Sequence, residues 1–187
     1  MIDLALRLEP RNLAALWDAA YVEALCGHRA RAAEYLDKAD QVYLNHPETL
    51  LARIRIGLWM KERMMIAWAR ENMASVDGVA TAFQSAAIRM FLEPEPDEEV
   101  GTLTALAAGE DTPLAARARI MQLVAERMAI GGMVDDAWSA LRAASAHAID
   151  AIWFMRCPVL ERMASMPAFL SLRSHIAARA AQVFEAP

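Results

Sequence analysis

The stretch GHRARAAEYLDKA, residues 27–39, decides the fold, because its pattern returns as GMVDDAWSALRAA at residues 132–144. Both copies follow Gly-x4-Ala-x3-Leu-x2-Ala, and they lie 105 residues apart, which is three steps of 35. Arrays of paired helices repeat at about 34 residues. Glycine tolerates the left-handed backbone that ends a helix, and the two alanines let the following helix pack closely, with the leucine between them in the seam. The pattern therefore predicts a stack of helical hairpins.

Composition favours an all-α protein. The chain has 187 residues, of which 57% are apolar, with only 7 glycines and 8 prolines. Alanine, leucine, methionine, arginine and glutamate dominate, and all of them form helices readily. Alternating β-branched stretches are absent from the sequence, so a substantial sheet is not expected. The net charge of −5 disfavours a nucleic-acid surface, which needs clustered basic residues, and we expect no direct nucleic-acid contact.

Features of secretion and membrane insertion are also absent from the sequence. Cys26 and Cys157 form no recognisable disulfide or metal framework. No apolar run approaches the roughly 20 residues of a membrane span. The first residues, MIDLALRLEP, lack the basic segment of a secretory signal. We therefore expect a cytoplasmic protein without a membrane span.

The first full hairpin is predicted over residues 13–46. Asn12 is placed to cap a helix at about 13–26, a second helix is expected at about 30–44, and Pro47 ends the hairpin. Residues 1–12 resemble the second half of a preceding hairpin, which suggests a C-terminal piece of a longer protein; a short capping helix is the alternative. If they are a half-repeat, its apolar side chains should be exposed or covered by another chain and should drive self-association through the N-terminal end; they are Ile2, Leu4, Leu6 and Leu8.

The middle of the chain carries a degenerate copy of the pattern. Its second helix is expected at about 62–75, with Ala67 and Ala74 placed 35 residues after Ala32 and Ala39. Glutamates occupy the glycine and leucine positions at 62 and 71. Helices at about 79–92 and 97–109 follow, separated by the acidic, proline-containing segment EPEPDEE at 93–99.

The C-terminal third begins with the hairpin that holds the second clean motif. Its helices are expected at about 113–130 and 134–147. The sequence then becomes richer in aromatic residues, and prolines 158 and 167 each restart a short helix, the last at about 168–184. We therefore expect repeats over 1–147, with the first one truncated, and capping helices over 148–187 packed on the same solenoid.

Residues 13–46 and 114–147 resemble tetratricopeptide repeats. Trp17, Ala20, Gly27 and Leu36 match the usual repeat positions, as do Ala32 and Ala39. The tail, Trp153-x4-Pro158-Val-Leu160-x6-Pro167, resembles the end of the repeat region in bacterial multidomain regulators that carry a winged-helix transcription, cyclase or kinase domain. At the acid and arginine positions of those tails this chain has methionine and alanine. The resemblance implies an all-α solenoid with a right-handed superhelix in a regulatory protein.

No catalytic, cofactor-binding or metal-binding residues are predicted. The four histidines, His28, His46, His147 and His175, are scattered, and nothing resembles a zinc motif, a phosphate-binding loop or a nucleophile elbow. We therefore do not expect an enzyme. Five methionines cluster in the middle of the chain, at 60, 64, 65, 73 and 90. They fill the core or line an exposed adaptable groove, and the sequence leaves both alternatives open.

If the repeat register holds, the first helices of the hairpins line a concave face. That putative partner-binding face comprises Trp17, Asp18, Tyr21, Arg53, Ile56, Arg119, Gln122 and Glu126. Its mixed polar and aromatic character suits an extended peptide or a helix of another protein in the groove. The leading hypothesis is a non-catalytic protein–protein interaction module, the regulatory part of a bacterial signalling or transcription protein. The alternative is a small-molecule-sensing helical-repeat domain with its ligand between hairpins.

Overall fold

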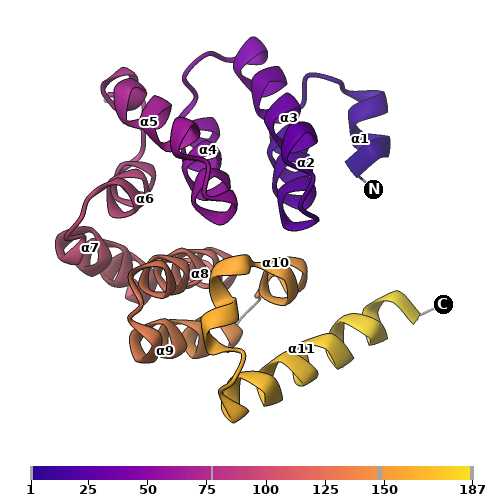
Figure 1. Ribbon diagram of the computed structural model, residues 1–187, viewed down its shortest axis with the longest axis vertical. Coiled ribbons are helices and arrows are strands. Elements are labelled where there is room, and N and C mark those ends of the chain that lie inside the picture. The colour runs from indigo at the N-terminus through magenta and orange to yellow at the C-terminus, as the bar shows by residue number, and fades with distance from the viewer. Residues whose placement is uncertain (1, 77, 147–148, 186–187) are drawn as a thin grey trace. The chain divides into compact units, whose positions relative to one another are not determined.

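The computed structural model describes residues 2–76, 78–146 and 149–185, together with all their side chains except those of Asp3 and residues 182–185. These described residues form helices joined by turns, with no strand among them, so the predicted all-α fold class is confirmed (Figure 1). The chain divides into two compact units, Met1–Glu99 (unit 1) and Val100–Pro187 (unit 2). The sequence did not predict this division. The boundary that it did predict, between residues 147 and 148, falls outside the described residues.

Unit 1 consists of helices that pack on their neighbours in chain order (Figure 1). In this order they are α1 (Ile2–Leu8), α2 (Leu13–Leu25), α3 (Arg29–Val42), α4 (Pro47–Met60), α5 (Arg63–Asn72), the 3-10 turn η1 (Met73–Ser75) and α6 (Ala82–Leu92). Helix α1 contacts α2, α2 contacts α3 and α4, and α4 contacts α3, α5 and α6. Helix α7 (Asp97–Ala108) begins at the end of this unit and continues into the next.

Polar side chains start three of these helices. The Asn12 carboxamide accepts a hydrogen bond from the Ala15 amide at 3.0 Å, which confirms the predicted cap of α2. The His46 ring caps α4 by accepting from the Glu48 amide at 3.1 Å. Thr81 and Gln84 form a reciprocal capping box on α6.

One turn geometry recurs in the described chain. At the end of α2, the His28 amide donates to the Glu23 carbonyl at 2.8 Å, and Gly27 has a left-handed φ of 82°. The matching bond at the end of α4 joins Glu62 to Gly57 at 2.8 Å, and at the end of α8 (Leu114–Gly131) it joins Met133 to Met128 at 2.9 Å. Each is the six-residue bond of a Schellman turn.

The left-handed residue of the middle turn is Lys61, with a φ of 58°. It lies 34 residues after Gly27, not 35, so the predicted register of the second hairpin is wrong by one residue. Ala67 and Ala74, which were expected at the helix contact, are exposed. In the corrected register Ile66 is the counterpart of Ala32 and lies against Gly57, while Ala69 is fully buried on α5. The register was misplaced because Lys61 adopts the left-handed backbone conformation for which the sequence pattern requires a glycine.

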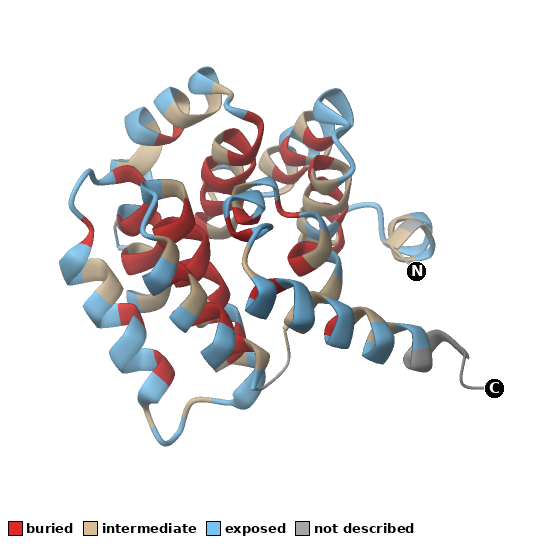
Figure 2. Cartoon of the chain, turned by 60° about the horizontal axis from the view of Figure 1, so that its bottom comes forward, coloured by how far each residue is buried: buried red, intermediate tan, exposed pale blue. Residues whose placement is uncertain are grey.

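Helices α4 and α5 approach each other closely at Gly57. A Cβ atom placed there would lie 3.0 Å from Met65 Cβ and 3.2 Å from Ile66 Cγ1. Helix α4 is also the most buried element of unit 1: of its fourteen residues only Glu48, Arg53 and Leu58 are not buried (Figure 2). This central helix therefore positions the side chains of its neighbours.

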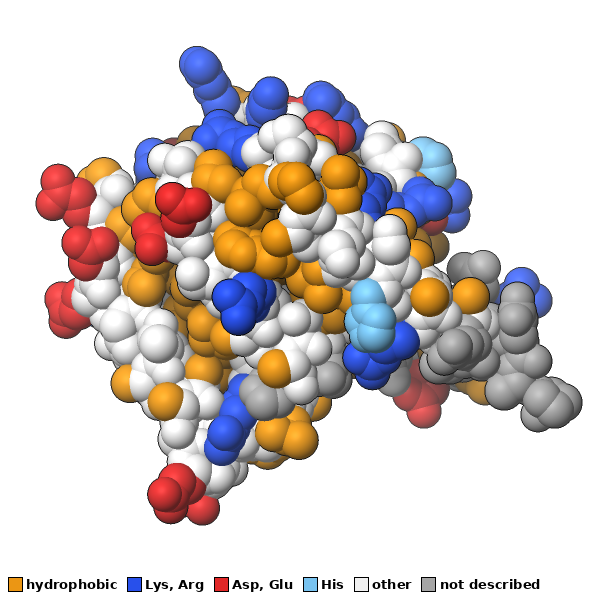
Figure 3. All heavy atoms as spheres, turned by 90° about the horizontal axis from the view of Figure 1, so that it is seen from below, with side chains coloured by type: hydrophobic (Ala, Val, Ile, Leu, Met, Phe, Trp, Pro, Cys, Tyr) orange, Lys and Arg blue, Asp and Glu red, His pale blue; other side chains and the backbone are white. Residues whose placement is uncertain are grey.

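Unit 2 is built around α8. Helix α9 (Val134–Ser145) packs along it, and the shorter elements α10 (Ala151–Arg156), η2 (Pro158–Met163) and α11 (Pro167–Glu185) follow. The predicted seam of the second clean motif is confirmed, since Ala137, Leu141 and Ala144 are all fully buried. Hydrophobic side chains gather in the middle of the view from below, in which α9 and α11 face the viewer (Figure 3).

The C-terminal elements attach to this core through aromatic side chains. The Trp153 indole on α10 donates to the Glu126 carboxylate on α8 at 3.1 Å, and both residues are buried. Phe154 packs against Phe169 of α11, with ring centroids 5.2 Å apart. The Trp153 contact therefore joins α10 to α8, and the phenylalanine pair joins α10 to α11.

Candidate partner-binding surface

An aromatic cluster lies where α2 meets the start of α4. The Trp17 indole donates to the Thr49 hydroxyl at 2.9 Å, and its ring lies 4.8 Å from the His46 ring. Tyr43 approaches the other side of His46 edge-on at 5.3 Å and is half exposed. Leu44, the next residue, is 71% exposed. This corner therefore offers aromatic and aliphatic surface to the solvent.

One helical turn along α2, an arginine lies over two neighbouring aromatic rings. The Arg55 guanidinium is 4.7 Å from the centroid of Tyr21 and 5.0 Å from that of Trp59. The two rings are 5.7 Å apart. Arg55 is only 7% exposed, so its charge is held by the faces of both rings in a largely desolvated site.

We call these residues the aromatic strip. It comprises Trp17, Tyr21, Tyr43, His46, Arg55 and Trp59. Tryptophan, tyrosine and arginine are the residue types that contribute most to protein interfaces, because they bury much surface and keep a polar group. Trp17 and Tyr21 stand one turn apart on α2 and join the two halves of the strip.

A second network fixes Arg53 and removes it from the strip. Its guanidinium donates to Asp40 at 2.7 Å and to Asp37 at 2.7 Å, and it stacks on the Trp68 ring at 4.8 Å. The Arg53 and Asp40 side chains are only 12% and 14% exposed. Arg53 therefore ties α3, α4 and α5 together and presents little surface to a partner.

The residues of the predicted concave face that lie in unit 1 differ in exposure. Trp17 and Tyr21 are half-buried within the strip, and Asp18 is exposed beside them. Ile56 is fully buried, so it offers no surface. The one-residue shift in register turns α4 by about 100°, which brings Arg55 rather than Ile56 beside Tyr21.

The remaining three predicted residues belong to α8 in unit 2. Arg119 is exposed, whereas Gln122 and Glu126 are buried. The Asp150 amide donates to the Gln122 carboxamide at 3.3 Å, and Trp153 donates to Glu126. The segment that begins α10 therefore covers this part of the predicted face.

His46 is the titratable group of the strip. Burial lowers the pKa of its imidazole below the usual 6.5, and the nearby Glu48 carboxylate opposes that effect. The ring nitrogen Nδ1 accepts the amide hydrogen of Glu48, so the neutral form with the proton on Nε2 is the one that caps α4. Protonation of Nδ1 would remove that acceptor.

Sequence reasoning found Trp17 and Tyr21 but missed Arg55, Trp59 and His46. Arg55 and Trp59 are four residues apart on α4, a spacing that places two side chains on one helix face. That spacing is a signal for a shared site once the second register is corrected. His46 is one of four scattered histidines in the sequence, and no local pattern indicates its contact with Trp17.

The methionines of the middle cluster differ in burial. Met60 and Met90 are buried and fill the core, whereas Met64 is 79% exposed. Within the described part of the chain, no group of three histidine, cysteine or acidic side chains is placed to hold a metal ion. The same part contains no helix that is both long and apolar enough to cross a membrane.

Comparison with known proteins gives no match to a protein-family model, to a characterised protein or to a solved structure. The resemblance to tetratricopeptide repeats therefore rests on the residues of this chain alone.

Proposed function

We propose that this chain is a non-catalytic interaction module that binds a segment of another protein along the aromatic strip of unit 1. The observation that carries the proposal is the strip itself, in which Trp17, Tyr21 and Tyr43 are partly exposed and are backed by the buried pair of Arg55 and Trp59 on the adjacent helix. Rigid aromatic side chains bind a partner at low entropic cost because few of their torsions have to be fixed.

We further propose that the helix pairs form a solenoid of antiparallel hairpins of the tetratricopeptide type. Two features support this architecture: the recurring Schellman turn, and the contacts that α4 makes with both α2 and α6. First helices that stack side by side would give the continuous surface that such repeats use for binding. A regulatory role in a bacterial signalling or transcription protein follows from the resemblance of the tail and is part of the same proposal.

Selection from a library of displayed random peptides, with the whole chain as bait, tests the interaction. Enriched peptides are synthesised and their affinity is measured by fluorescence anisotropy. Replacing both Tyr43 and Leu44, in a Tyr43→Ala/Leu44→Ser variant, should weaken binding at least about tenfold, since central aromatic contacts dominate interfaces. The melting temperature should change little, because both side chains are exposed.

A matched control removes an exposed apolar side chain elsewhere. Leu114→Ser in unit 2, where the leucine is 59% exposed, should leave the affinity unchanged. Peptides that bind the Tyr43→Ala/Leu44→Ser variant with wild-type affinity would show that the exposed end of the strip is not part of the binding surface.

One observation favours the small-molecule alternative. An open cavity of about 370 Å³ lies between α1, α2 and α3, and it is lined by Leu6, Arg7, Pro10, Leu16, Tyr35 and Lys38. This volume falls within the roughly 300–1,000 Å³ of typical ligand sites. Native mass spectrometry of the purified chain distinguishes the two proposals: a retained small molecule that a Leu6→Trp variant fails to retain would favour a sensor.

A further inference from the structure

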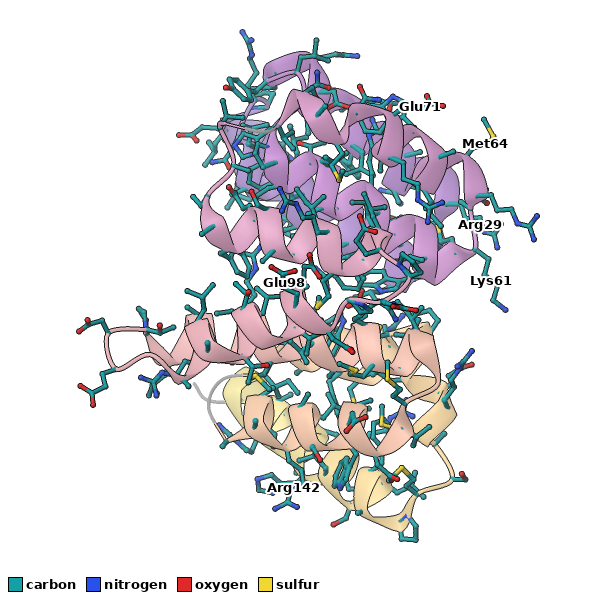
Figure 4. The ribbon with its side chains drawn as sticks, turned by 90° about the vertical axis from the view of Figure 1, so that its left-hand side faces the viewer. Arg29, Lys61, Met64, Glu71, Glu98 and Arg142 are labelled. Carbon is teal, nitrogen blue, oxygen red and sulfur yellow. The ribbon has the colours of Figure 1, made fainter. Side chains whose placement is uncertain are left out.

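The edge of unit 1 that carries the α2–α3 and α4–α5 turns exposes a methionine among cations. Met64, in the first turn of α5, is 79% exposed, the highest exposure among the large apolar side chains described. Arg29, Lys61 and Met64 project from the same side of the unit (Figure 4). An apolar side chain that is so exposed contributes nothing to the core, and a partner that covered it would bury its apolar surface.

An ion pair joins the two turns into one surface. Arg29 at the start of α3 donates to the Glu62 carboxylate before α5, with Nη1 and Oε1 2.7 Å apart. We call the combined surface the basic edge; it comprises Arg29, Arg31, Lys61, Arg63 and Met64. The Arg29 and Arg31 side chains remain 63% and 58% exposed despite their ion pairs.

The basic edge carries a local excess of positive charge. Within the two turns, four cations accompany two carboxylates, Glu23 and Glu62, which leaves a formal excess of two positive charges there. Glu23 pairs with Arg31 and contacts the His28 ring, and Glu62 pairs with Arg29. Lys61 and Arg63 are exposed and form no ion pair with any described residue.

From this arrangement we propose that the basic edge is a second docking surface, which binds a short acidic peptide segment carrying an apolar side chain. Carboxylates of the segment pair with Lys61 and Arg63, and its apolar side chain covers Met64. A methionine suits this contact because its flexible thioether adapts to side chains of different shape. The charge complementarity steers the segment to the edge and fixes its register.

The rest of the chain favours a peptide over a long polyanion. The whole protein carries a net charge of −5, so a nucleic acid extending past the edge would meet repulsion. A nucleic acid also needs a row of phosphate contacts, whereas this edge offers only two cations without ion pairs and an apolar centre. A short acidic segment would contact only the basic edge and would avoid the negative charge of the rest of the protein.

This proposal does not rest on the proposed function. The basic edge shares no residue with the aromatic strip, and each surface is tested by its own substitutions. If substitutions in one surface abolish its peptide binding and the other surface still binds its own peptide, the two proposals are tested separately.

Fluorescence anisotropy on the whole chain tests the proposal with a labelled probe peptide of sequence EELEELEE. The same measurement is made with a QQLQQLQQ peptide, with oligothymidylate and with phosphatidylserine vesicles. We expect saturable binding of the acidic peptide that weakens as salt rises, and no comparable binding of the other three. Lys61→Glu/Arg63→Glu should weaken peptide binding at least about tenfold, since both attractive charges become repulsive.

The matched control is Arg11→Glu/Arg89→Glu, which makes the same change in net charge at exposed positions outside the edge. It should bind like the wild type, and Met64→Ser should weaken binding without altering the salt dependence. Three results would overturn the proposal: equal weakening in both double variants, binding of the glutamine peptide as tight as that of the acidic one, or tighter binding of oligothymidylate or vesicles.

Discussion

His46 links the stability of unit 1 to the protonation of a single side chain. Its ring caps α4 and stacks against Trp17, and burial holds its pKa below 6.5. Because the pKa is lower in the folded state, the folded protein favours the neutral ring. The resulting stability is fully present above pH 6.5 and is lost as the pH falls through the folded-state pKa.

We therefore expect wild-type stability to fall between pH 7 and pH 5 by more than that of His46→Asn. Asparagine caps a helix without titrating, and loss of a side-chain cap costs about 0.5–2 kcal/mol. Urea unfolding at both pH values measures the difference. Parallel losses of stability in the two proteins would contradict the role given to His46.

The strip also illustrates what a sequence reveals at the level of single residues. Trp17 and Tyr21 could be predicted because they lie in the hairpin whose glycine marks the register. Arg55 could not, because its contact with Tyr21 depends on the register of the next hairpin, and a shift of one residue moves a side chain about 100° around a helix. Buried partners such as Thr49 under Trp17 depend on tertiary packing that no local pattern encodes.

Among the helices and turns, Lys61 is the residue most at odds with its backbone. A left-handed φ is unfavourable for a side chain with a Cβ, and glycine occupies the matching position in the other two Schellman turns. Lys61→Gly should therefore raise the free energy of unfolding by about 0.5–1 kcal/mol.

Asn45 provides the comparison, since it has the same φ of 58°. Asparagine tolerates the left-handed region better than lysine, so Asn45→Gly should give a smaller gain. Chemical denaturation of both variants measures the two gains. A loss of stability in Lys61→Gly would mean that the lysine side chain contributes more than its backbone conformation costs.

Most helices could be predicted because their boundaries carry chemical signals. Asn12 and Pro47 mark starts, Gly27 and Gly132 mark ends, and the observed bounds differ from the predicted ones by three residues or fewer. The error arose at α5, where neither end has such a signal: Glu62 caps nothing with its side chain, and Lys61 takes the place of a glycine. The register of the second hairpin was obtained by adding 35 to positions in the first hairpin. No residue in the α4–α5 turn indicates that the true spacing is 34.

At the scale of the whole molecule, no pattern in the sequence predicts the division at Glu99 and Val100, which falls inside α7. The apolar side chains of α1 differ in their exposure. Leu4 and Leu8 on α1 are 59% and 74% exposed, whereas Ile2 and Leu6 are half-buried. Leu4 and Leu8 could form the predicted contact between two copies of the chain, and self-association through this end stays a prediction.

Sedimentation velocity across a concentration series tests this prediction. The wild type should show reversible association, and Leu4→Glu/Leu8→Glu should remain monomeric because two charges replace the apolar contact. Leu44→Glu changes an equally exposed leucine away from α1 and should associate like the wild type. If both variants associate alike, α1 is not the contact.

The close approach at Gly57 has a consequence for which residues this seam can hold. The matching residue before each turn is Glu23 in the α2–α3 pair and Met128 in the α8–α9 pair, and the counterparts of Ile66 in those pairs are Ala32 and Ala137. These two pairs thus combine a large residue with a small one, and the α4–α5 pair reverses the order. A smaller residue at 66 would not by itself make room for a side chain at 57, because an added Cβ would still lie 3.0 Å from Met65 Cβ, an atom that every residue except glycine carries. Gly57 therefore sets the distance between two helix backbones, and a larger residue there would have to move a whole helix.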